Sequence, residues 1–93
     1  MIPLVTSVRF LHASRLDRQQ GLLGWVSAEL AGVVRIDGLV LRRTLRGDIR
    51  VFPPERIDRG GRRHRVVDVI DARLERAWEA EILVALKAQG VLP

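Results

Sequence analysis

The sequence predicts an α+β domain: a small antiparallel β-sheet of four to five strands with a C-terminal α-helix packed on it. Three observations support this class. Apolar and polar residues alternate through the first half of the chain, Gly, Pro and Asp separate the alternating segments, and helical spacing is confined to the end. A chain of 93 residues supplies one hydrophobic core, so we expect residues 1–93 to form a single domain.

The first two strands are predicted over residues 5–11 and 21–30, where residues of strand type recur with a period near two. Residues 15–20 between them are polar and are expected to form a loop. In the second strand Trp25, Ser27 and Glu29 alternate with Val26, Ala28 and Leu30, and one of these two faces is expected to be buried.

A turn at Ala31-Gly32 is expected to lead into a third strand over residues 33–43. Asp37-Gly38 interrupts this strand and predicts a bulge or a close backbone approach. The fourth strand is predicted over residues 49–52. Pro53-Pro54 removes two backbone donors, so the strand must end there or continue at the edge of a sheet.

Residues 55–65 contain a Gly pair and five arginines, which is typical of a flexible basic loop or the tip of a hairpin. Residues 66–70 are expected to return as a short strand. Asp71 is a suitable N-cap for a helix over residues 72–89, which ends at Gly90. The apolar stripe expected to cover the sheet consists of Leu74, Trp78, Ile82 and Leu86, flanked by Ala77 and Ala85.

The charge distribution indicates a polyanionic partner. The net charge is +5, and Lys87 is the one lysine among the 16 Lys and Arg residues. Residues 35–65 hold ten basic and four acidic residues, so the positive excess is concentrated in the middle third. Clustered cations bind phosphate chains by releasing condensed counterions. The sequence therefore predicts nucleic-acid binding, with a solvated basic loop that has no partner as the alternative.

Arginine is the residue type expected to make these contacts, because its guanidinium group pairs bidentately with phosphates and guanine edges. His64 lies within the arginine-rich segment and is expected to be a neutral hydrogen-bonding residue. The candidate nucleic-acid contacts are Arg56, Arg59, Arg62, Arg63, His64, Arg65, Arg73 and Arg76.

Arg73 and Arg76 lie in the first turns of the predicted helix, where cations oppose the helix dipole. A bound phosphate offsets that cost. The alternative is pairing within the helix, because Glu79 lies three residues after Arg76 and Glu75 lies close to Arg73. Both interpretations stay open at the level of the sequence.

Three segments carry a resemblance to a known family: residues 36–41 (IDGLVL), residues 47–53 (GDIRVFP), and residues 61–70 running into a helix. In this order they resemble the SpoVG family of bacterial septation and sporulation regulators, over most of the chain. Phe52-Pro53 stands where the family has Met-Pro. Arg56 stands where the family has the Arg of Ser-Lys-Arg.

The chain departs from the family pattern at three positions. Pro54 and Glu55 replace the Ser and Lys of that motif, and Val69 replaces a Pro before the final helix. The resemblance implies a small antiparallel sheet with a C-terminal helix, a homodimer, and binding of DNA that extends in some members to RNA. Glu55 reverses the charge at a position where the resemblance implies a phosphate contact.

Catalytic arrangements are not expected. The serines lack a G-x-S-x-G context, there is no G-x-x-x-x-G-K loop, and Asp71 suits a helix cap better than a carboxylate pair with Asp68. With no Cys and two His, a zinc site is not expected either. We therefore expect no enzymatic activity, no cofactor, no metal and no small-molecule substrate. Trp25 and Trp78 are expected in core or dimer packing rather than in base stacking.

A second hypothesis is a protein-interaction module that recruits a division or regulatory protein through strand edges or the helix face with Trp78. Exposure of both Leu83 and Val84 is expected to mark such a surface. The N-terminus lacks a basic leader and a small-residue cleavage site, and no apolar run approaches the roughly 20 residues of a membrane span. These features predict a cytoplasmic location and no membrane partner.

Overall fold

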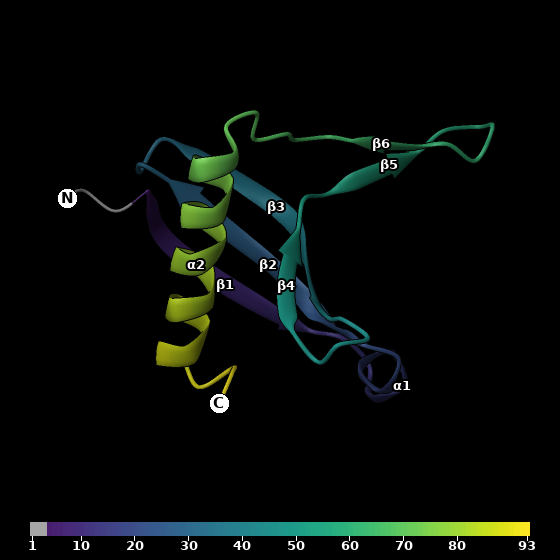
Figure 1. Ribbon diagram of the computed structural model, residues 1–93, viewed down its shortest axis with the longest axis horizontal. Helices are drawn as coiled ribbons and strands as arrows, with labels where there is room; N and C mark the ends of the chain where they lie inside the picture. The colour runs from purple at the N-terminus through teal and green to yellow at the C-terminus, as the bar shows by residue number, and fades with distance from the viewer. Residues whose placement is uncertain (1–3) are drawn as a thin grey trace.

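The computed structural model describes residues 4–93, which form a four-stranded antiparallel sheet, a separate two-stranded hairpin and two helices. The sheet order is β1-β2-β3-β4, and α2 crosses one face of it (Figure 1). The predicted α+β class is confirmed. The elements are β1 (Val5–His12), α1 (Arg15–Gln19), β2 (Leu22–Leu30), β3 (Val34–Arg43), β4 (Ile49–Phe52), β5 (Glu55–Ile57), β6 (Arg63–Arg65) and α2 (Ala72–Ala88).

The turn between β2 and β3 has the expected position. Val33 N donates to the Leu30 carbonyl over 3.0 Å, and the two central residues, Ala31 and Gly32, have φ values of 54° and 68°. Two positive φ values at the centre of a β-turn match the twist of the strands that the turn joins. Ala31 is the one non-glycine residue within residues 4–93 with a positive φ.

The bulge predicted at Asp37-Gly38 is present in β3. Val26 pairs with Leu39 and Ala28 pairs with Ile36, so β3 has one extra residue between these pairs. Strict alternation from Ile36 would place Leu39 on the opposite face of the sheet. The extra residue corrects the register, so that Ile36 and Leu39 both face the core and are 7% and 0% exposed.

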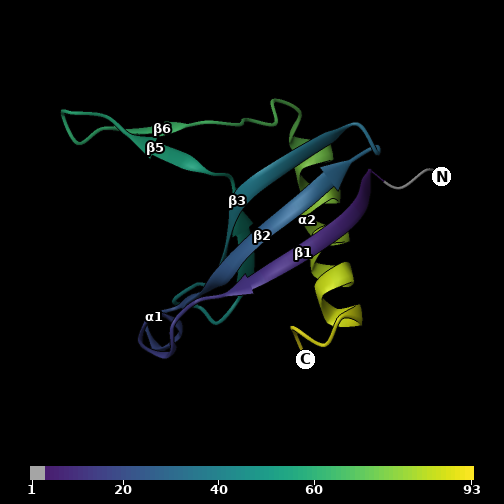
Figure 2. The ribbon, with the colours of Figure 1, turned by 180° about the vertical axis from the view of Figure 1, so that it is seen from behind.

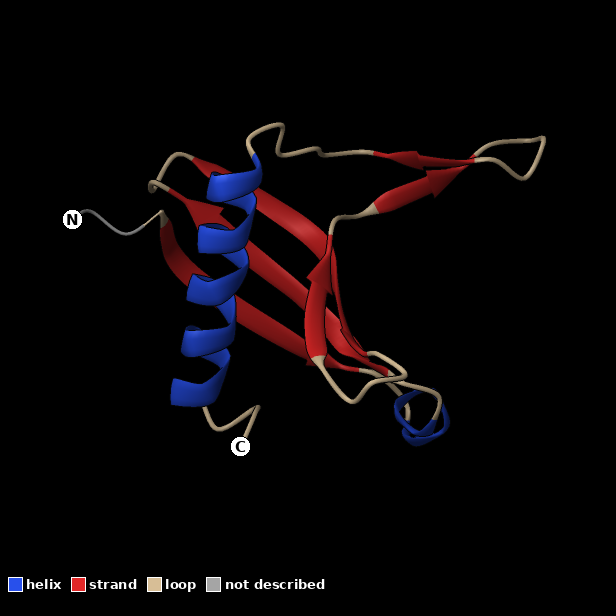
Figure 3. Ribbon diagram, in the orientation of Figure 1, coloured by secondary structure: helices blue, strands red, loops and turns tan. Residues whose placement is uncertain are grey.

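The core lies between the sheet and α2, which Figure 3 shows lying across the strands. Trp78, Ile82 and Leu86 are buried there as expected. Leu74 was expected in the same stripe, and that prediction is wrong because its side chain is 49% exposed. Positions four residues apart drift by about 40° around a helix, so Leu74 lies about 120° from Leu86. Ala77, expected to flank the stripe, is also exposed, whereas Ala85 packs against the core.

Residues 15–20 were expected to form a polar loop, but Arg15–Gln19 form the short helix α1. The hydroxyl of Ser14 accepts a hydrogen bond from Asp17 N over 3.1 Å and caps the first turn. No helix within residues 4–93 combines the length and the apolar character needed to cross a bilayer.

The short strand expected over residues 66–70 is also wrong, although these residues have strand-type side chains. On β4, Val51 N donates to a carboxylate oxygen of Glu79 on α2 over 2.8 Å, so this amide is not available to pair with another strand. The segment instead packs the side chains of Val67 and Val69 against the core on its way to α2.

Candidate nucleic-acid interface

The arginine-rich segment forms the β5–β6 hairpin, which projects from the body of the protein (Figures 1 and 2). The sequence left open whether this segment is a flexible loop or a hairpin, and it is a hairpin. Its strands pair Glu55 with Arg65, Arg56 with His64, and Ile57 with Arg63. Every residue of the two strands is exposed. The hairpin therefore presents its side chains to solvent on both faces.

Asp58 organises the tip of the hairpin. One carboxylate oxygen accepts hydrogen bonds from the backbone N–H groups of Gly60 and Arg62, each over 2.9 Å. The other oxygen lies 2.7 Å from His64 Nε2. Gly61 N in turn donates to the Asp58 carbonyl over 3.0 Å. One side chain thus closes the turn that carries the arginines.

These contacts also change the acidity of the carboxyl group. The hydrogen bond with His64, followed by those from the Arg62 and Gly60 amides, holds the pKa of Asp58 below its usual value. The ionised carboxylate is the form that accepts these bonds. Order at the tip therefore depends on Asp58 remaining charged.

The pairing divides the hairpin residues between two faces. Arg56 and His64 form one cross-strand pair, and contact between His64 and Asp58 places Asp58 on the same face. Arg62 lies opposite Asp58, whose N–H donates to the Arg62 carbonyl over 2.9 Å, and so belongs to this face as well. Arg63 belongs to the opposite face. The predicted contacts therefore form two surfaces rather than one.

The ion pairs distinguish among the arginines. Arg65 Nη1 lies 2.9 Å from an Asp68 oxygen, so its charge is partly compensated. Within residues 4–93 no acidic side chain forms an ion pair with the remaining hairpin arginines. These are Arg56, Arg59, Arg62 and Arg63.

The start of α2 differs from the hairpin. The side chain of Asp71 accepts from the N–H groups of Arg73 and Leu74 over 2.9 and 3.3 Å, so a carboxylate already occupies the amide site that a phosphate would use. The pairing of Arg76 with Glu79 is wrong, because Glu79 binds Arg50 and Val51 of β4 instead. In the described chain neither Arg73 nor Arg76 has an ion-pair partner.

The hairpin tip points away from α2 in both ribbon views (Figures 1 and 2). The start of α2 therefore lies apart from the tip of the hairpin. Because Asp71 occupies the backbone amides at the start of α2, only the side chains of Arg73 and Arg76 could contact a phosphate there. Their role as nucleic-acid contacts stays a prediction.

The face of the sheet opposite α2, which is turned toward the viewer in Figure 2, carries an apolar row. The register aligns Leu11 with Trp25, Trp25 with Val40, and Val40 with Phe52 across all four strands. Leu11 is 67% exposed and Phe52 is 38% exposed, while Trp25 and Val40 are half-buried. The row therefore places partly exposed apolar side chains across all four strands of the sheet.

The surface of α2 that was expected to contact a partner exposes fewer of its apolar side chains than expected. Val84 is 66% exposed, but Leu83 is half-buried and packs against the core, so the condition that both be exposed is not met. Trp78 is buried in the core, as expected.

Sequence reasoning missed two elements of the candidate site. The role of Asp58 carries a signal, because an Asp two residues before Gly-Gly is typical of a turn in which the side chain binds the local backbone. The apolar row leaves no signal in the sequence of any single strand. Its members come from four strands and become neighbours only through the register of the sheet. Comparison with protein-family models gives no match for this chain, and comparison with curated proteins gives none.

Proposed function

We propose that this chain is a nucleic-acid-binding regulator that acts as a homodimer and grips its partner with the β5–β6 hairpin. One observation carries the proposal: a projecting two-stranded ribbon bears four arginines that have no ion-pair partner within residues 4–93. The resemblance to the SpoVG family supports the same function and favours DNA, with RNA as a second polymer. The proposed role is one of binding rather than of catalysis, and it places the chain in the cytoplasm.

The dimensions of the hairpin suit a duplex. β5 and β6 each span three residues, or roughly 10 Å at about 3.3 Å per residue, and the turn over residues 58–62 lies beyond them. The major groove of B-form DNA is about 12 Å wide and about 8.5 Å deep, and it admits a two-stranded ribbon. Arginines on the two faces of such a ribbon reach the two walls of the groove, where the phosphates lie.

The apolar row supports the homodimer. Two copies that cover their rows of Leu11, Trp25, Val40 and Phe52 remove this surface from water and present two hairpins to one nucleic acid. Replacing the exposed members with lysine, as in Leu11→Lys/Phe52→Lys, is expected to shift the protein to a monomer in sedimentation velocity experiments. An unchanged sedimentation coefficient would remove the row from the dimer contact.

The same row favours a second candidate function, a protein-interaction module without direct nucleic-acid binding. In that case the row contacts a different protein, and the arginines of the hairpin serve solubility. Nucleic-acid binding at low salt separates the two functions, because only the first requires it.

The decisive experiment is fluorescence anisotropy with labelled double-stranded DNA, single-stranded DNA and RNA over a series of salt concentrations. For duplex DNA each phosphate that the protein neutralises adds about 0.9 to the steepness with which log affinity declines against log salt. The variant Arg56→Gln/Arg62→Gln removes two arginines of one face. Its slope is expected to be shallower than that of the wild type by about 1.8.

Arg9→Gln/Arg46→Gln serves as the matched control. Both residues are exposed, lie outside the hairpin and form no ion pair in the described chain, so the variant loses the same net charge. Its slope is expected to stay near that of the wild type. Equal changes in the two variants would show that net charge, rather than the hairpin, sets the affinity. No binding at low salt would favour the protein-interaction module.

A further inference from the structure

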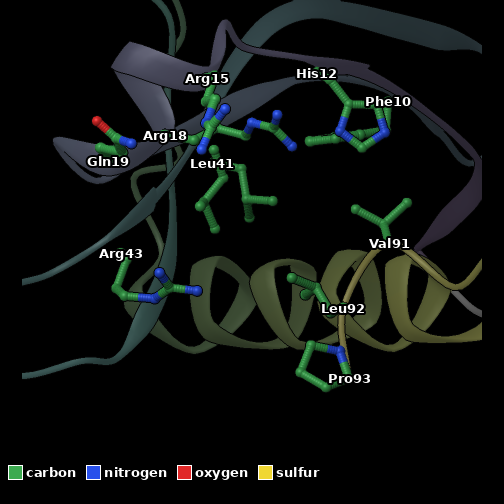
Figure 4. Close-up of a pocket in the computed structure, with 11 residues that line it drawn as sticks. Phe10, His12, Arg15, Arg18, Gln19, Leu41, Arg43, Val91, Leu92 and Pro93 are labelled. Atoms are coloured by element: carbon green, nitrogen blue, oxygen red, sulfur yellow. The ribbon is translucent and has the colours of Figure 1, made fainter.

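A hollow of about 460 Å³ lies at the opposite end of the sheet from the hairpin, between α1 and the C-terminal tail (Figure 4). Three arginines border it: Arg15 and Arg18 from α1, and Arg43 from the end of β3. Its apolar wall is formed mainly by Phe10, Leu41 and Leu92. Neither the family resemblance nor the proposed function involves this hollow.

The framework around the arginines is well braced. Arg43 N donates to the Gly21 carbonyl over 2.7 Å and Ala13 N donates to the Leu23 carbonyl over 3.1 Å, so both ends of the α1 segment are attached to the sheet. A Cβ on Gly21 would lie 2.9 Å from the Arg43 carbonyl oxygen, so only glycine permits this close approach. These backbone contacts thus fix the positions from which the three arginine side chains extend.

The tail closes the other side of the hollow. Val91 N donates to the Leu86 carbonyl over 2.9 Å, which turns the chain back after α2, and Leu92 is 9% exposed. Figure 4 shows Val91, Leu92 and Pro93 across the hollow from Arg15 and Arg18. The apolar wall is therefore built from the packed core and is not a chance group of surface side chains.

The charge of the hollow is uncompensated. No aspartate or glutamate is among its lining residues, and within the described part of the chain none forms an ion pair with its arginines. Three positive charges around one space repel one another unless an anion is present. Guanidinium forks match phosphate and carboxylate oxygens, and three of them balance the dianion of a phosphate monoester better than a single carboxylate.

We propose that this hollow binds an organic phosphate, with the phosphate held by Arg15, Arg18 and Arg43 and the non-polar part of the ligand against Phe10 and Leu92. A volume of about 460 Å³ falls in the range of ligand sites, roughly 300–1,000 Å³, and fits a mononucleotide. The same chemistry is offered by a free nucleotide and by the terminal phosphate of a nucleic-acid strand.

The test is isothermal titration calorimetry of the full chain with AMP at low salt, with adenosine as the probe that lacks the phosphate. AMP is expected to bind with one site per chain, and adenosine at least about tenfold more weakly. Arg15→Gln/Arg18→Gln is expected to weaken AMP binding by about tenfold or more, and Arg43→Gln provides a second, single change. Circular dichroism checks that each variant is folded.

Arg56→Gln/Arg62→Gln is the control, because it removes two arginines from the hairpin and leaves the hollow intact. This variant is expected to keep wild-type affinity for AMP even if it loses nucleic acid, so the two sites are tested separately. Absence of AMP binding by the wild type, or an equal loss in this control, would overturn the proposal.

A trinucleotide with a 5′-phosphate, compared with its 5′-hydroxyl form, identifies the source of the ligand. If the phosphorylated form binds as AMP does and the hydroxyl form does not, the site takes strand ends. If AMP binds and neither trinucleotide does, the site takes free nucleotides. Either result supports an organic-phosphate site. Equal binding of AMP and adenosine contradicts it.

Discussion

Glu79 connects α2 to β4, the strand that leads into the hairpin. Its carboxylate accepts from Val51 N over 2.8 Å and from Arg50 Nε over 3.0 Å. The two contacts differ in their surroundings. The Glu79 side chain is 18% exposed and its hydrogen bond with the Val51 amide is partly buried, whereas the Arg50 side chain is 54% exposed. We therefore expect Glu79→Ala to destabilise the protein mainly through the loss of the hydrogen bond from the Val51 amide.

The magnitude follows from these two environments. A hydrogen bond to a charged group contributes about 1.5–3 kcal/mol, and its loss leaves the half-buried Val51 N–H without a partner. An exposed ion pair contributes about 0–1 kcal/mol, even though the hydrogen bond to Glu79 raises the pKa of Arg50. Glu79→Ala should therefore lower the free energy of unfolding by about 2–3 kcal/mol, and Arg50→Gln by at most about 1 kcal/mol.

Urea unfolding followed by tryptophan fluorescence measures both changes, because Trp78 lies one residue before Glu79 and is buried. In thermal unfolding, the loss in Glu79→Ala corresponds to on the order of 10 °C for a chain of this length. Arg76→Gln is the control for pairing within the helix and should have little effect. A loss in Arg50→Gln as large as that in Glu79→Ala would refute the reasoning, because it would assign the energy to the ion pair.

Three further predictions concern single positions. Ala31→Asn is expected to raise the free energy of unfolding by up to about 1 kcal/mol in urea titrations, because asparagine tolerates the positive φ of 54° better than alanine does; a loss would show that the turn is not strained. Because the pKa of Asp58 is lowered in the folded protein, its stabilisation of the hairpin tip is present above the ordinary aspartate pKa and disappears as the pH falls through the lowered value. Protection of the Gly60 amide from hydrogen exchange should show this pH dependence, and Asp58→Ala should abolish it. The indole N–H of Trp78 is buried without a hydrogen-bond partner in residues 4–93, so Trp78→Phe should change the free energy of unfolding by no more than about 1 kcal/mol, and a loss above about 3 kcal/mol would indicate that the N–H has a partner.

Elements that depend on local chemistry could be predicted from the sequence. The alternation around Val26, the turn at Ala31-Gly32 and the Asp71 cap each rest on residues within a few positions of one another. The arginine-rich segment is likewise identified from its composition, and the polyanionic partner that it indicates stays a prediction. Short-range spacing and side-chain type are sufficient for such features, because the contacts concerned form within a single turn or hairpin.

The predictions that failed depend on contacts distant in the chain. Residues 66–70 have strand-type side chains, yet Val67 and Val69 pack against the core, and the amide of Val51 on β4 is bonded to Glu79. Leu74 has helical spacing, yet over three turns the spacing of four residues moves its position around the helix away from the sheet. Propensity describes what a segment can form, and a neighbouring element decides whether a partner remains for it.

The candidate sites show the same division. The amino-acid sequence alone established which residue types are available for binding: a basic middle third rich in arginine, with no cysteine. Tertiary structure decided where they lie. It separated the hairpin arginines onto two faces, aligned the apolar row across four strands, and brought Arg43 to Arg15 and Arg18 at one hollow. The physical reason is that strand register and packing, which join residues far apart in the chain, determine which side chains share a surface.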